Sequence, residues 1–151
     1  MNFQEAIGAF VLGKLNTENL PTVAAEAVRS NYDSPSLWEL ADSEGADPDH
    51  IRKLLFRALD ELGIQAPSVE TAAITAAKEI ARDVVEGTIT PYQGAKRIWS
   101  DLYTRYPTLQ KLAPFVGFAS EYEDDEAHRG EYDQMIVDEC KLLLNSVDSG
   151  C

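Results

Sequence analysis

Apolar residues recur along this chain at the spacing of an α-helix, and three prolines each follow a residue that caps helices. Ser34-Pro35, Asp47-Pro48 and Thr90-Pro91 each pair an N-cap side chain with a proline at the first helical position. Proline is tolerated there because the first amides of a helix have no intrahelical acceptor. No segment alternates polar and apolar residues as a half-buried strand does. The sequence therefore predicts an all-α fold, an orthogonal or irregular bundle of seven to eight helices.

The periodicity and the cap signals together place the expected helices. We expect them over residues 2–15, 17–30, 34–41, 47–62, 68–85, 90–106, 108–120 and 128–145. Within the stretch 108–120, Pro114 and Gly117 predict a kinked helix or two separate pieces. Gly63 is placed to stop the fourth helix in a left-handed conformation. These helices are short enough to pack around a single core.

Length and composition favour one domain. The chain has 151 residues, of which 44% are apolar, which is enough to bury a sizeable core. Residues 1–151 are thus expected to form a single α-helical domain. Its one soft seam is the segment GIQAP at residues 63–67, which separates two expected helices. Acidic charge is shared evenly between the two halves and gives no reason to split them.

The charge balance excludes several classes of partner. Lys and Arg number 13 against 26 Asp and Glu, a net charge of -13 that repels phosphate backbones and anionic lipid. We therefore expect neither nucleic-acid nor membrane binding. Cys140 and Cys151 give no disulfide framework and no zinc spacing, and no signal peptide or apolar run of membrane-spanning length is present. A cytoplasmic protein without a cofactor is expected.

The densest feature is an acidic segment at residues 121–126, with the order Glu121, Tyr122, Glu123, Asp124, Asp125 and Glu126. One interpretation is a solvated acidic loop, or the acidic first turn of the last helix, where negative charge suits the helix dipole. A second is a metal site that recruits Glu121, Asp124 and His128, with Glu131 as a further candidate ligand, although neither an EF-hand nor a di-iron spacing is present. The third is a docking surface for a basic protein. In that hypothesis all six residues contact the partner, and Tyr122 is the aromatic anchor.

A basic and aromatic segment precedes the acidic one. Basic and aromatic side chains are interleaved in it, namely Tyr92, Lys96, Arg97, Trp99, Tyr103, Arg105, Tyr106 and Lys111. Such a pattern can stack on nucleotides, but Trp99 shares a helical stripe with apolar residues and is expected to be a core anchor. The basic side chains then face outwards. We expect them to pair with the acidic segment, in the same molecule or in a second copy, which leaves a homo-oligomer open.

Two elements of the sequence resemble a group of uncharacterised bacterial helical proteins. The first is GTITPYQGAKRIW at residues 87–99, and the second is FVGFASEYED at residues 115–124. The group pairs a G-x-I-x-P-Y-x-G-A-x-x-I-W element with a later F-V-G-x-A-S-E-x-E-D element. In that group a tryptophan and a histidine are common where this chain has Tyr122 and Asp125. The resemblance implies a bacterial, cytosolic helical protein and supplies no activity.

Catalytic signatures are scarce in this sequence. It has no Gly-x-Ser-x-Gly elbow and no phosphate-cradling glycine loop, and Cys140 lies on an apolar stripe. The leading hypothesis is a non-catalytic module that docks a basic protein, as bacterial immunity proteins dock basic nuclease toxins. One alternative is a metal-dependent or carboxylate enzyme that uses residues 121–131. Another is a self-associating structural protein.

Overall fold

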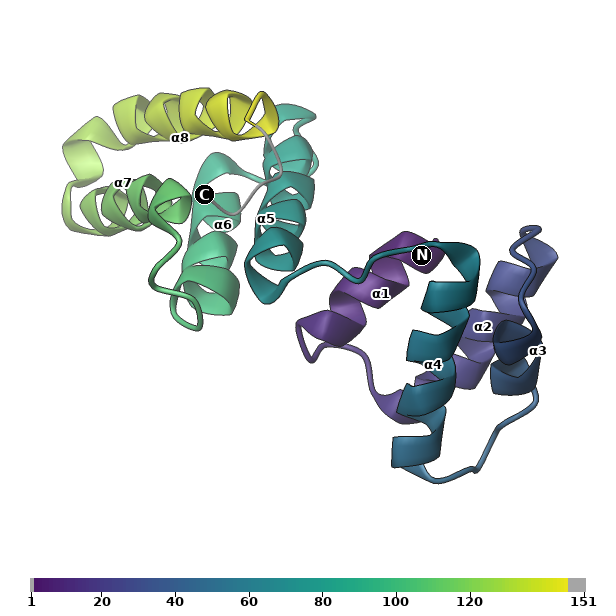
Figure 1. Ribbon diagram of the computed structural model, residues 1–151. Helices are drawn as coiled ribbons and strands as arrows, with labels where there is room; N and C mark the ends of the chain where they lie inside the picture. The colour runs from purple at the N-terminus through teal and green to yellow at the C-terminus, as the bar shows by residue number, and fades with distance from the viewer. Residues whose placement is uncertain (1, 147–151) are drawn as a thin grey trace. The chain divides into compact units, whose positions relative to one another are not determined.

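The protein is all-α, as predicted. The computed structural model describes residues 2–146, and this part of the chain contains eight α-helices and no β-strand (Figure 1). The helices are α1 (Phe3–Val11), α2 (Leu20–Arg29), α3 (Pro35–Ala41), α4 (Pro48–Leu62), α5 (Val69–Val85), α6 (Pro91–Arg97), α7 (Ala113–Asp124) and α8 (Arg129–Leu144). Three short 3₁₀ segments are η1 (Thr17–Asn19), η3 (Gln110–Leu112) and η4 (Glu126–His128), and a π-helical segment is η2 (Ile98–Tyr103). None of these helices is long and apolar enough to cross a membrane.

The chain divides into two compact units, unit 1 (Met1–Ala72) and unit 2 (Ala73–Cys151). The division falls inside α5, a few residues beyond the seam expected at 63–67. Each unit has a hydrophobic interior of its own. The single domain expected over residues 1–151 stays a prediction.

The three cap-and-proline pairs begin helices as predicted. Ser34 Oγ accepts a hydrogen bond from the Leu37 amide at 2.9 Å, and an Asp47 carboxylate oxygen accepts one from the Asp49 amide at 3.1 Å. Thr90 and Gln93 form a reciprocal capping box at the start of α6. At the other end of α4, Gly63 adopts a φ of 69°, the left-handed stop expected there.

Unit 1 contains α1 to α4, and α3 packs against both α2 and α4. Its interior is filled by large aliphatic side chains that the apolar spacing had placed on one face of each helix. The fully buried ones are Leu20, Leu37, Leu40, Ile51, Leu54 and Leu55. Glu61 of α4 also links this helix to α3. Its carboxylate accepts hydrogen bonds from the Ser36 amide at 2.9 Å and from the Ser36 hydroxyl at 2.6 Å.

Unit 2 is built around the small-residue face of α5. Ala73, Ala77 and Ala81 are fully buried, and Gly94 of α6 lies so close to α5 that a β-carbon would overlap the Val84 side chain. The helices α6, α7 and α8 pack on one another through bulkier side chains. Large, fully buried side chains in this part of unit 2 are Ile98 and Leu102 of η2, Leu112 of η3, Phe115 of α7 and Ile136 of α8.

Two helix boundaries differ from the sequence prediction in the first thirty residues. The first helix ends at Val11 instead of residue 15, because Gly13 takes a φ of 75° and turns the chain away. The second begins as the 3₁₀ turn η1, and its α-helical part starts at Leu20 with Pro21 in the first turn. Thr17 therefore does not cap an α-helix.

The region of residues 108–120 also differs from expectation. After the 3₁₀ turn η3, α7 begins at Ala113, and Pro114 occupies its first turn instead of kinking it. Gly117 lies within α7 without interrupting it, and the helix continues to Asp124. As a result, α7 extends four residues past the predicted end and includes most of the acidic segment.

Candidate partner-binding surface

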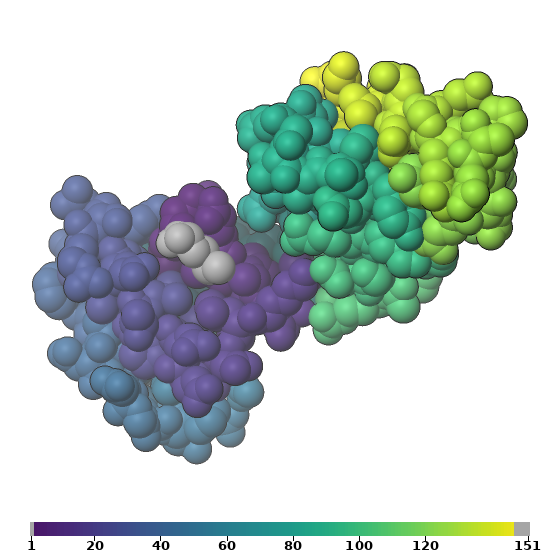
Figure 2. Space-filling view, turned by 180° about the vertical axis from the view of Figure 1, so that it is seen from behind, coloured from purple at the N-terminus to yellow at the C-terminus, as the bar shows by residue number. Residues whose placement is uncertain are grey.

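The acidic segment begins in the last turn of α7, whereas the sequence suggested a loop or the first turn of the last helix. Glu121, Glu123 and Asp124 are in the last turn of α7, Asp125 ends the helix, and α8 begins only at Arg129. The exposed carbonyls of a helix C-terminus carry partial negative charge, so carboxylates there are disfavoured by the dipole. The α7–α8 connection is yellow-green in Figure 2 and lies at the surface of unit 2. Hydrogen bonds and basic side chains offset this repulsion for part of the segment.

Glu123 is held by two residues of α6. Its Oε2 accepts a hydrogen bond from the Tyr92 hydroxyl at 2.6 Å and lies 2.9 Å from Lys96 Nζ. These contacts, that of Tyr92 first, lower the pKa of the Glu123 carboxyl, and the same contacts raise the pKa of Tyr92 and of Lys96. The expected pairing of the basic and acidic segments within one molecule is thereby confirmed for Lys96.

Tyr122 is half-buried between two side chains. Its ring stacks on the Tyr92 ring at a centroid distance of 4.4 Å and an interplanar angle of 14°. The Arg129 guanidinium carbon lies 4.8 Å from the centroid of the Tyr122 ring, and Arg129 Nε donates a hydrogen bond to the Tyr122 carbonyl at 3.0 Å. Because the Tyr92 ring covers one face of the Tyr122 ring, the Arg129 guanidinium covers the other face. A partner could not stack on Tyr122 without displacing one of them.

Asp125 accepts hydrogen bonds from residues that follow it. His128 Nδ1 lies 2.9 Å from Asp125 Oδ2, and the Tyr132 hydroxyl donates to the same oxygen at 3.1 Å. Partial burial raises the pKa of the Asp125 carboxyl, but the hydrogen bonds from His128 and Tyr132 outweigh it, so this pKa is lowered. The carboxylates around Tyr132, with Asp125 foremost, raise the pKa of its hydroxyl to about 12. We call Tyr122, Glu123 and Asp125, with the side chains that hold them, the inner network.

The other three acids of the segment are exposed, and none of them makes a close contact with this network. Glu126 is exposed, with Arg129 Nη1 at 3.9 Å, and Glu121 accepts a long hydrogen bond of 3.3 Å from Tyr132. Asp124 is exposed and has no hydrogen-bond or ion-pair partner in the described part of the chain. We call these three residues the outward carboxylates.

The structure does not assemble the metal site that the sequence offered as one alternative. Among residues 2–146 no group of three His, Cys, Asp or Glu side chains could hold a metal ion. His128 Nδ1 is turned to Asp125, which was not among the candidate ligands. Cys140 is fully buried, and burial raises the pKa of its thiol to about 12, so it is unsuited to nucleophilic chemistry.

Trp99 is only half-buried, so the expected core anchor is partly wrong. At Ile98 the α6 helix widens into the π-helical segment η2, where the Thr104 amide donates to the Trp99 carbonyl at 2.9 Å. The wider turn breaks the α-helical stripe that had placed Trp99 with the apolar residues. Its ring instead lies 4.3 Å from Lys96 Nζ, so Lys96 touches both Trp99 and Glu123.

Sequence reasoning missed Arg129 and Tyr132 as parts of this surface. Both lie in the first turn of α8, and they reach the acidic segment because η4 folds α8 back along α7 (Figure 1). Because neither pair lies within one helix, their spacing of 7 residues from Tyr122 and Asp125 gave no helical signal. Comparisons of the chain with protein-family models, curated proteins and solved structures found no match.

Proposed function

We propose that this protein is a non-catalytic binding module that docks a basic protein through its acidic segment. The observation that carries the proposal is the set of outward carboxylates, Glu121, Asp124 and Glu126, exposed at the C-terminal end of α7. The helix dipole adds to their negative potential at this end. A bacterial, cytoplasmic protein that neutralises a basic partner, as immunity proteins do, fits this arrangement.

The inner network supports the proposal by fixing the backbone that carries these acids. Glu123 is tied to α6 and Asp125 to η4 and α8, so the residues on either side of Asp124 are both anchored. A surface that is already ordered loses less conformational entropy when it binds. The net charge of -13 also steers a positively charged partner towards the protein and raises its association rate.

A matched pair of triple variants tests the proposal. The partner is captured at low salt from a bacterial lysate, purified, and titrated at several salt concentrations against each variant. Glu121→Gln/Asp124→Asn/Glu126→Gln removes the outward carboxylates and should weaken binding on the order of 10-fold, with a shallower salt dependence. Glu18→Gln/Glu39→Gln/Glu44→Gln makes the same charge change at exposed sites of unit 1. This control should bind like the wild type.

Equal weakening by the two triple variants would mean that net charge alone attracts the partner, and the site assignment would then be wrong. Unchanged binding by the first variant would have the same consequence. Light scattering over the same salt series separates this proposal from self-association, which predicts that the particle mass falls as salt rises. Metal analysis of protein purified without chelator addresses the enzyme alternative.

A further inference from the structure

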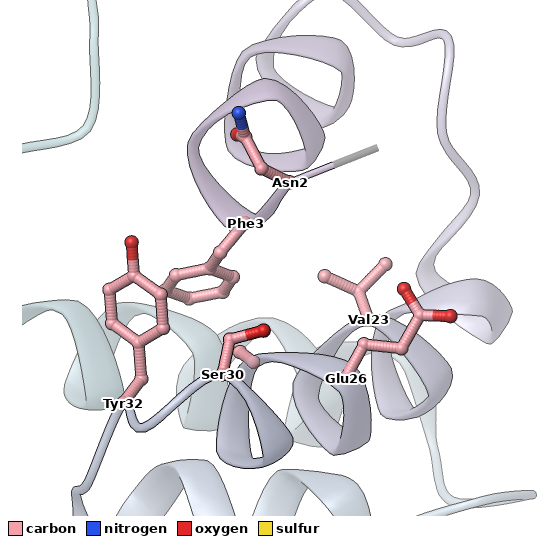
Figure 3. A pocket seen from close by; sticks show the side chains of 7 residues that line it. Asn2, Phe3, Val23, Glu26, Ser30 and Tyr32 are labelled. Atoms are coloured by element: carbon pink, nitrogen blue, oxygen red, sulfur yellow. The ribbon is translucent and has the colours of Figure 1, made fainter.

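Unit 1 has a pocket of about 290 Å³ between the start of α1 and the end of α2 (Figure 3). The rings of Phe3 and Tyr32 form one side, with their centroids 5.0 Å apart at an angle of 59°. Glu26 lies across the pocket from these rings in the figure, and Ser30 lies between. The remaining lining residues are Asn2, Val23 and Ala27.

The backbone at the end of α2 places Tyr32 in this wall. Asn31 takes a φ of 76°, the left-handed conformation that ends helices. The Tyr32 amide donates to the Ala27 carbonyl, and the Asn31 amide donates to the Val28 carbonyl, both at 3.1 Å. These two bonds make a Schellman motif, which turns the chain back so that Tyr32 meets Phe3. The pocket is therefore a product of how α2 ends.

Three polar groups of the pocket have unused bonding capacity. Within residues 2–146, the Glu26 carboxylate, the Ser30 hydroxyl and the Tyr32 hydroxyl have no hydrogen-bond or ion-pair partner in the protein. The Asn2 side chain differs, because it is committed to capping α1 through the Glu5 amide at 2.8 Å. The pocket thus offers one negative charge and two hydroxyl oxygens beside an aromatic and aliphatic wall.

This combination selects the chemistry of a ligand. A cation can pair with the Glu26 carboxylate, while an anion is repelled by Glu26 and by the net charge of -13. Val23, Ala27 and the rings cover an apolar stem. The volume corresponds to roughly ten waters, enough for a chain of a few carbons with an ammonium at its end. We propose that this pocket binds a primary ammonium on a short apolar stem, the chemistry shared by a lysine side chain and a small aliphatic amine.

Amide chemical shifts of the full chain, followed by NMR in phosphate buffer, test this assignment. The probes are n-butylammonium, neutral 1-butanol, and Nα-acetyl-lysine methylamide. Butylammonium should shift the amides around Phe3, Ser30 and Tyr32 and saturate in the millimolar range, and butanol should bind several-fold more weakly. Glu26→Gln should weaken butylammonium binding about 2- to 5-fold, the range of one exposed ion pair. Glu39→Gln, an exposed glutamate of α3, is the matched control and should have no effect.

The lysine derivative distinguishes the two sources of the ammonium. Binding as tight as that of butylammonium assigns the pocket to a lysine side chain, and binding of butylammonium alone assigns it to a free amine. The proposal is overturned by the absence of saturable shifts at these amides. It is equally overturned when butanol binds as tightly as butylammonium, or when Glu26→Gln and Glu39→Gln behave alike. None of these results depends on the acidic segment, because the pocket uses no residue of unit 2.

Discussion

The two units differ in the helix contact that is most sensitive to substitution. Unit 1 packs long aliphatic side chains such as Leu37 and Leu54 into one cluster, and these are fully buried. In unit 2, α5 presents Ala77 and Ala81, and Gly94 lets α6 come within contact of Val84. In unit 1 a truncated leucine would leave a cavity, whereas at the α5–α6 contact of unit 2 there is no space for an added methyl group. Cavity formation should therefore damage unit 1 most, and added bulk should damage unit 2 at this helix contact.

The largest expected effect is the removal of volume from unit 1. Leu54→Ala should lower the free energy of unfolding by about 2–5 kcal/mol, the usual range for a buried leucine. Urea unfolding followed by circular dichroism measures it. The control is Leu142→Ala in α8, where the side chain is 65% exposed and the change should stay within about 0.5 kcal/mol. Similar midpoints for the two variants would contradict the core described for unit 1.

Two glycine-to-alanine substitutions in unit 2 should change the stability of the fold in opposite directions. Gly94→Ala puts a β-carbon into the Val84 side chain, and overpacking of this kind costs about 1–3 kcal/mol. Gly117→Ala meets no atom within 4 Å and lies inside α7, where alanine is a better helix former by up to about 1 kcal/mol. Thermal unfolding of both variants provides the comparison. Stabilisation by both would show that α6 and α5 can separate without loss.

Substitution of Asn31, in the backbone turn beside the unit 1 pocket, should have a smaller effect on the free energy of unfolding. Asn31→Val places a β-branched residue at a φ of 76°, which costs roughly 1–2 kcal/mol. Asn31→Gly accepts the same conformation and should leave the free energy of unfolding nearly unchanged. Chemical denaturation compares the two. Equal stability of the variants would mean that the left-handed turn is not needed to end α2.

The sequence predicted the helices where the information is local. A cap, its proline and the first apolar residues lie within one turn, so the starts at Ser34, Asp47 and Thr90 are confirmed. The bounds of α7 were harder to predict because a proline can begin or break a helix, and Pro114 begins this one. The π-helical widening at Ile98 has no recognised sequence signal. Because the expected helix stopped at residue 120, the sequence did not place the acidic segment in the last turn of α7.

The candidate surface was predicted as a group because its residues are adjacent, but adjacency does not determine direction. Successive residues of a helix point about 100° apart, so Glu123 turns to α6 while Asp124 faces solvent. Which of them faces inward depends on where α6 and α8 lie, and this is tertiary information. The contact between basic and aromatic side chains and the acidic segment could be expected from charge. The roles of Arg129 and Tyr132 could not.

The smallest effect concerns acid stability and separates the two kinds of carboxylate. Hydrogen bonds lower the pKa values of Glu123 and Asp125, so these groups stabilise the folded state above the ordinary carboxyl pKa of about 4. Their contribution is lost as the pH falls through the lowered folded-state values. Glu123→Gln/Asp125→Asn should therefore lower the urea midpoint at pH 6.5, and the difference from wild type should shrink towards pH 3. Asp124→Asn/Glu126→Gln makes the same charge change on the outward side, where neither acid accepts a close hydrogen bond, and it should not lower the urea midpoint at pH 6.5. Parallel pH profiles for the two double variants would mean that the inner network adds nothing to stability and that all of these carboxylates act only through their charge.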